Sequence, residues 1–159
     1  MRTRMKTALF ILPTLVVMAL TGCSPKVDDA GVVLEPVPFT MLVPSHVAAR
    51  LSLGAVDGPF GEAVKEDGAL AATTVYYQPA SGERTIFMTA YYFPADKFDA
   101  LQNPDEPPLY GFEVIRDGGN VLSVAGPQDT IFAPDSTDGK NLEELYGRIY
   151  LPGTYRAPE

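Results

Sequence analysis

The chain has little of the chemistry on which most small enzymes depend. Its 159 residues include one cysteine, one histidine and no tryptophan. A single cysteine excludes a disulfide within the chain, and a single histidine leaves no second imidazole for a metal site. The Gly-x-Ser-x-Gly turn that presents the nucleophile of α/β-hydrolases is also missing from the sequence. These absences favour a protein that acts by binding, with no catalytic residue, no metal and no cofactor.

Basic residues are scarce once the first segment is set aside. The whole chain has a formal charge of −8, the first 22 residues contribute +3, and the remainder therefore carries −11. Binding to nucleic acid or to anionic lipid head groups requires a basic surface. We therefore predict no nucleic-acid partner. The acidic surface is consistent with a solvated domain, and a basic or cation-bridged partner is the alternative.

The sequence also lacks an apolar run long enough to cross a bilayer. Its longest such run, Thr7 to Leu20, has 14 residues, whereas a membrane-spanning helix needs about 20. Arg2, Arg4 and Lys6 precede the run, and small residues follow it. A basic start, a short apolar run and a small-residue junction are typical of a secretory signal peptide, here residues 1–22.

The end of this segment reads Leu20-Thr21-Gly22-Cys23 and resembles the lipobox of bacterial lipoproteins. The resemblance implies cleavage between Gly22 and Cys23 and a diacylglycerol on the Cys23 thiol, which would consume the only cysteine. It also implies a protein anchored to the cell membrane or outer membrane and facing the extracytoplasmic side. The alternative is an ordinary secretory peptide followed by a chance cysteine.

Two segments follow the signal peptide. Residues 23–38 are acidic and flanked by prolines, and we interpret them as a lipidated tether. Residues 39–159 are long enough for one globular domain. This domain begins with a strand over 39–43, in which Phe39, Met41 and Val43 share one face, and a helical turn over 45–50. Residues 54–68 contain four glycines and are predicted to form an irregular loop.

The strongest structural signal is a hairpin formed by residues 70–78 and 85–93. Both segments are rich in Thr, Val, Ile and aromatic residues, and residues 79–84 have turn composition. The expected pairs are Tyr77–Ile86, Val75–Met88 and Tyr76–Phe87. The second segment is apolar on both faces, which predicts a central strand covered on both sides.

The rest of the domain adds a second hairpin and two helices. A short helix is predicted over 94–101, a hairpin over 112–116 and 121–125, and a final helix over 141–150 with Leu142, Leu145 and Ile149 on one stripe. The order predicts an α+β fold, in which an antiparallel sheet of about five strands (two hairpins) carries a short middle helix and a C-terminal helix packed on it. Residues 39–44, FTMLVP, resemble the PsbP/Mog1-like family without its usual Trp, and this resemblance implies a topology only.

Three polar features are candidates for chemistry. His46 is the only histidine and is interpreted as an ordinary loop or helix-start residue. Residues 135–141 (DSTDGKN) do not have EF-hand spacing, so Asp138 or Asn141 is expected to cap the last helix. The neighbouring carboxylates are expected to be solvated charges because general acid–base catalysis needs two acids placed across a cleft; these pairs are Glu66–Asp67, Asp105–Glu106 and Glu143–Glu144.

The tyrosines of the first hairpin are the most distinctive functional signal. Alternation along a strand sends some side chains inward and others outward, and outward tyrosines suit an interface because each combines a large apolar area with a polar group. The candidate partner surface comprises Tyr76, Tyr77, Tyr91 and Tyr92. The predicted function is a membrane-anchored, non-catalytic binding or accessory module with an unknown envelope protein or ligand as its partner. The alternative is a small ligand carrier or hydrolase.

Overall fold

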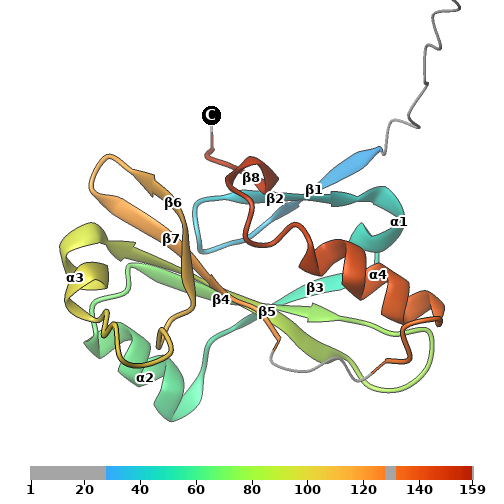
Figure 1. The fold of residues 1–159 in the computed structure, drawn as a ribbon, viewed down its shortest axis with the longest axis horizontal. Coiled ribbons are helices and arrows are strands. Elements are labelled where there is room, and N and C mark those ends of the chain that lie inside the picture. Colours follow the sequence, from blue (N-terminus) through green and yellow to red (C-terminus); the bar gives the residue numbers. More distant parts are fainter. Residues whose placement is uncertain (1–27, 128–131, 159) are drawn as a thin grey trace, which may run out of the picture.

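The computed structural model describes residues 28–127 and 132–158 and has the predicted α+β class. Eight strands form two antiparallel sheets, and four α-helices accompany them (Figure 1). The elements are β1 (Asp29–Val33), β2 (Thr40–Pro44), α1 (Ser45–Ala48), β3 (Leu51–Ala55), α2 (Gly58–Glu66), β4 (Ala71–Tyr77), β5 (Thr85–Pro94), α3 (Ala95–Ala100), β6 (Phe112–Asp117), β7 (Asn120–Ala125), α4 (Thr137–Tyr146), a 3₁₀ turn (Pro152–Thr154) and β8 (Tyr155–Arg156).

The larger sheet has the strand order β3-β4-β5-β7-β6, and the smaller sheet has the order β1-β2-β8. Strand β5 therefore lies in the middle of the five-stranded sheet, which confirms the central strand predicted from its apolar faces. Both predicted hairpins are present as β4–β5 and β6–β7. The second turn contains Gly118 and Gly119 at φ +57° and +107°, values that glycine adopts readily.

The register of the first hairpin agrees with the prediction at its middle and differs at its tip. Val75 pairs with Met88 as expected, but Tyr76 pairs with Ile86 and Tyr77 with Thr85. The ladder skips Phe87 at this point, so the strand contains a bulge. The bulge lets Phe87 and Met88 both enter the same core. Simple alternation had placed them on opposite faces.

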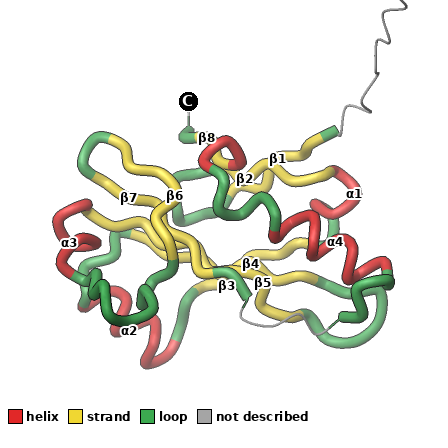
Figure 2. The backbone as a smooth tube through the Cα atoms, in the orientation of Figure 1, coloured by secondary structure: helices red, strands yellow, loops and turns green. Residues whose placement is uncertain are grey.

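The five-stranded sheet carries a hydrophobic core on each face. One core lies between the two sheets and includes Met88 and Ala90 of β5 with Leu142 and Leu145 of α4. The other lies under α2 and α3 and includes Tyr91 and Phe93 of the same strand. Figure 2 shows α2 and α3 on one side of the sheet and α4 with the small sheet on the other. Because successive side chains of β5 point to opposite faces of the sheet, this strand contributes residues to both cores.

The predicted tether is too long, because its second half belongs to the domain. Residues 29–33 form β1, which pairs with β2 along its whole length. Leu34 and Val37 are 0% and 1% exposed, and the Val37 N–H donates to the Leu34 carbonyl at 2.9 Å in the turn back to β2. The prolines that suggested a linker instead flank this buried turn. Residues 29–38 therefore belong to the domain.

Residues 54–68 are also more regular than predicted, since they contain the end of β3 and all of α2. Two of the four glycines lie at the start of α2 and allow its tight geometry. Gly58 has a φ of +69°, and a Cβ on Gly61 would lie 2.1 Å from the Val56 carbonyl oxygen.

The last helix begins earlier and ends earlier than predicted: α4 spans Thr137–Tyr146. Leu142, Leu145 and Ile149 are buried as expected, the last of them beyond the helix.

The central position of β5 generates a test with an internal control. Met88 is fully buried, whereas Ile86 on the same strand is 57% exposed. Met88→Asp places an unpaired charge in the core, so we expect a loss of several kcal/mol from the roughly 5–15 kcal/mol typical of a domain. Ile86→Asp should leave the free energy of unfolding nearly unchanged. Denaturant unfolding of both variants measures the difference, and equal stabilities would contradict the buried position of β5.

Candidate functional site

Helix α4 is fixed at its start by a serine cap. The Ser136 hydroxyl accepts a hydrogen bond from the Gly139 N–H at 2.9 Å and donates to the Ala133 carbonyl at 2.6 Å. The sequence had pointed to Asp138 or Asn141 as the cap, and this prediction is wrong. Both residues lie inside the helix, where their side chains face the sheet. The capping role falls to Ser136 because it immediately precedes the first helical residue.

A buried tyrosine joins α4 to strand β4. The Tyr77 hydroxyl donates to Asp138 Oδ1 at 2.7 Å and accepts from Asn141 Nδ2 at 2.9 Å. The Ala80 N–H donates to Asp138 Oδ2 at 3.1 Å, and Arg50 Nη1 lies 3.6 Å from Oδ1. The hydrogen bond from Tyr77 holds the pKa of Asp138 below its ordinary value, and the Ala80 and Arg50 contacts act in the same direction.

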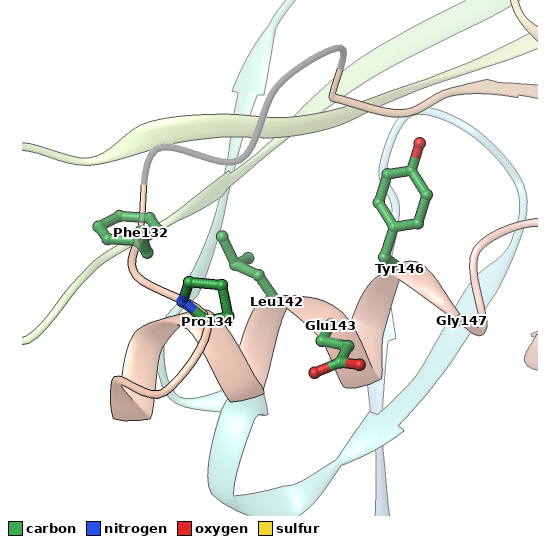
Figure 3. A pocket seen from close by; sticks show the side chains of 7 residues that line it. Phe132, Pro134, Leu142, Glu143, Tyr146 and Gly147 are labelled. Carbon is green, nitrogen blue, oxygen red and sulfur yellow. The ribbon is translucent and has the colours of Figure 1, made fainter.

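The outer flank of the helix borders an apolar groove of about 470 Å³. Figure 3 shows Phe132 and Pro134 at one end of this groove and Tyr146 at the other, with Leu142 and Glu143 between them on α4. Phe132 also packs edge-on against the ring of Tyr77, with centroids 6.1 Å apart. Tyr77, which hydrogen-bonds α4 to the sheet, therefore also supports Phe132 at one end of the groove. A volume of several hundred cubic ångströms and an apolar lining are typical of binding sites.

A row of aromatic rings extends from the groove across the surface. Tyr146 packs edge-on against Tyr150 at 6.1 Å between centroids, and Tyr150 packs edge-on against Phe112 of β6 at 5.6 Å. Tyr146 is 43% exposed and Phe112 is 58% exposed. The Tyr150 hydroxyl accepts from the Gly126 N–H at 3.1 Å, which fixes the middle ring. We call the groove and these three rings the α4 surface.

The charges around α4 are arranged asymmetrically. Among the residues that the structure describes, Glu143 is the only charged one that lines the groove. On the opposite flank, Glu144 contacts Arg148 at 3.4 Å and His46 at 3.7 Å, and Arg148 also contacts Asp29 at 2.9 Å. Arg148 and His46 are therefore engaged away from the groove, and the Glu143 side chain is exposed to solvent.

The tyrosines predicted from the sequence do not form one patch. Tyr77 and Tyr91 are buried, one in each core. Tyr92 is partly exposed but packs against Phe39 at 5.9 Å between ring centroids. Tyr76 lies on the other face of the sheet, where Arg84 stacks on its ring at 4.3 Å. Alternation along two neighbouring strands divided the four residues between two faces, so the exposed aromatic cluster lies on α4 and β6 instead.

The α4 surface was missed because its members are dispersed in sequence. Tyr146 lies one helical turn after Leu142, a member of the buried stripe, and this spacing is the one signal available from the sequence. Phe112 comes from a different element, and only the folded chain brings it to Tyr150. Cys23 and Gly22 lie outside the described residues.

The polar candidates do not assemble into a catalytic constellation. The His46 side chain is 60% exposed and pairs with Glu144, while the neighbouring Ser45 hydroxyl donates to the Asp28 carbonyl. Of the paired carboxylates, Asp67 accepts a hydrogen bond from Tyr110, Glu143 and Glu144 face opposite flanks of α4, and Asp105 and Glu106 are exposed. Within residues 28–127 and 132–158, no three His, Cys, Asp or Glu side chains gather as a metal site.

Comparison with known proteins gives no relative for this chain. No family model matches it, and neither a curated protein nor a solved structure is significantly similar to it. None of the helices in the described part of the chain is both long and apolar enough to span a membrane.

The Tyr77 network should stabilise the protein measurably. Tyr77→Phe leaves the buried Asn141 amide and the Asp138 carboxylate without a shared partner, so we expect a loss of about 1–3 kcal/mol in the free energy of unfolding. Tyr76→Phe, on the opposite face of the strand, should change little. Denaturant titration compares the two variants, and a wild-type stability for Tyr77→Phe would contradict this role.

The lowered pKa of Asp138 also predicts an acid-side dependence of stability. The folded state favours the ionised carboxylate, so its contribution is fully present above the ordinary aspartate pKa of about 3.9 and is lost as the pH falls through the lower folded-state value. Asp138→Asn should be less stable at neutral pH, and its stability should decline less steeply in acid. Melting temperatures measured from pH 7 to pH 2 test both expectations, and parallel curves for the two proteins would contradict them.

Proposed function

We propose that this protein is a membrane-anchored cell-envelope lipoprotein whose single α+β domain is a non-catalytic binding module. The anchor is supported by the Leu20-Thr21-Gly22-Cys23 sequence at the end of a short apolar run. The binding role rests on one observation, the α4 surface, in which an apolar groove continues into exposed aromatic rings. An exposed apolar surface of this kind marks interaction sites in soluble domains.

The partner that fits best is an apolar segment of another envelope protein that carries a basic residue. The groove has an apolar lining suited to aliphatic or aromatic side chains, formed by Phe132, Pro134 and Leu142. Tyr146 adds a large ring with a polar group, which is a common anchor at interfaces. Glu143 would face the basic residue, and the charge of −11 carried by residues 23–159 would favour the approach of such a partner.

A small-ligand carrier is the second candidate, and the volume of the groove favours it. About 470 Å³ can hold a small apolar molecule. In that case Glu143 and the Tyr146 hydroxyl would be the polar groups that orient the ligand. Native mass spectrometry of the purified full-length protein distinguishes the two candidates, since a carrier retains a bound small molecule and a protein-binding module does not.

The proposed lipid anchor can be tested by removing the Cys23 thiol. Cys23→Ala should abolish fatty-acid labelling and block cleavage after Gly22, because the acylated cysteine is the substrate of the lipoprotein signal peptidase in the family that this sequence resembles. The wild-type protein should partition into the detergent phase, since two or three acyl chains give stable anchoring. Partition of the wild-type protein into the aqueous phase would contradict the proposal.

The α4 surface is tested by site-specific photocrosslinking in native membranes. A photoreactive phenylalanine at Tyr146 should capture a defined envelope protein, and Glu143→Lys in the same chain should reduce capture by reversing the charge beside the groove. The control position is Ile86, which is exposed and apolar but lies on another part of the surface. Equal capture of the same protein from both positions, or capture that Glu143→Lys leaves unchanged, would contradict the assignment.

A further inference from the structure

The three-stranded sheet has one buried face and one exposed face. Met41 of β2 and Tyr155 of β8 pair with each other and lie in the core between the two sheets, so the inner face is covered. Successive residues of a strand point to opposite faces. Val33 of β1 and Leu42 of β2 therefore point outward, and Val33 is 54% exposed. Figure 1 shows this sheet at the top of the molecule and α2 at the bottom.

A hollow of about 250 Å³ extends this exposed face towards the segment that follows α4. Its lining includes Leu42 and Leu151, and Leu151 is 54% exposed. Asp29 and Arg148 border the same hollow. Apolar side chains from β1, from β2 and from the segment before the 3₁₀ turn thus share one side of the domain. We call Val33, Leu42 and Leu151 the outer face.

The charges on this side of the domain are few. Asp29 and Arg156 are the only charged residues within β1, β2 and β8. Asp29 forms an ion pair with Arg148 at 2.9 Å, and Arg156 points outward because its neighbour Tyr155 points into the core. Residues 23–159 as a whole carry −11. Anionic head groups repel an acidic surface, whereas the three strands and the hollow together contain two arginines and one acid.

The chain enters the domain on this same side. Strand β1 begins at Asp29, and six residues precede it from Cys23 onwards. Six residues reach at most roughly 20 Å, whereas a domain of this size is about 35 Å across. A lipid on Cys23 would therefore keep Asp29 in the half of the domain that is nearer to the bilayer.

We propose that the outer face rests on the head-group region of the bilayer that holds the lipid anchor, with Val33 and Leu151 inserted among the head groups. This inference rests on the anchor proposed at Cys23 and adds the surface through which the domain meets the membrane. Burial of apolar side chains at the interface strengthens membrane binding, and arginine side chains pair with lipid phosphates. The groove beside α4 stays accessible, because Arg148 is engaged on the flank of α4 away from the groove.

Hydroxyl-radical footprinting of the wild-type lipidated protein tests this contact without a substitution. Leu151 and Ile86 are matched probes, since both are aliphatic and they are 54% and 57% exposed. In phosphatidylcholine vesicles we expect Leu151 to be oxidised several-fold more slowly than Ile86, because only Leu151 is shielded by lipid. Equal rates would overturn the proposal. Protection of Leu151 in native membranes but not in these vesicles would also overturn it, and would assign the outer face to another protein.

Flotation of the same vesicles on a density gradient separates this inference from the anchor. Protein that floats, but in which Leu151 and Ile86 are oxidised equally, would keep the anchor and overturn only the contact through the outer face. Protein that does not float would overturn both.

A fluorescent label on β1 provides a second measurement. Val33→Cys and Ile86→Cys would each carry a polarity-sensitive fluorophore on the introduced thiol, since the Cys23 thiol is acylated in the proposed anchor. A quencher attached to the lipid should reduce the emission from position 33 several-fold more than the emission from position 86. Equal quenching at the two positions would overturn the proposal.

Discussion

The position of α4 depends on one hydroxyl group, that of Tyr77. It lies in a core between two sheets, donates to Asp138 and accepts from Asn141, and so satisfies two polar side chains of the helix at once. Phe132, which packs on the same ring, becomes a wall of the groove as a result. The location of the α4 surface therefore follows from a polar contact inside the molecule, since a buried polar group must be paired where it lies.

Much of the fold was predictable because its strongest signals are local. The composition of β4 and β5, the Gly-Gly turn between β6 and β7, and the two-faced apolar pattern of β5 each act within a dozen residues. The errors arose where a local pattern has two physical meanings. Prolines around Val37 fit a linker as well as a buried turn, and Gly58 and Gly61 fit a loop as well as a tight helix start.

The site was less predictable, because it depends on which face of each strand is covered. The alternation of tyrosines in the first hairpin was visible in the sequence, but the helices and the small sheet that bury Tyr77 and Tyr91 were not. Likewise, Tyr146 and Phe112 come from elements that only tertiary packing brings together. Asp138 was mispredicted for a similar reason. Its position in the sequence suited a helix cap, but its hydrogen-bond partner is Tyr77, 61 residues away.

The start of β1 at Asp29 limits how far the domain could stand from a lipid on Cys23, as proposed above. Six residues precede β1 from Cys23 onwards, and six residues reach at most roughly 20 Å. The domain would then be held close to the surface of the bilayer. Partners confined to the same surface meet it at a raised effective concentration. Contacts too weak to persist in free solution could therefore be sufficient at the membrane.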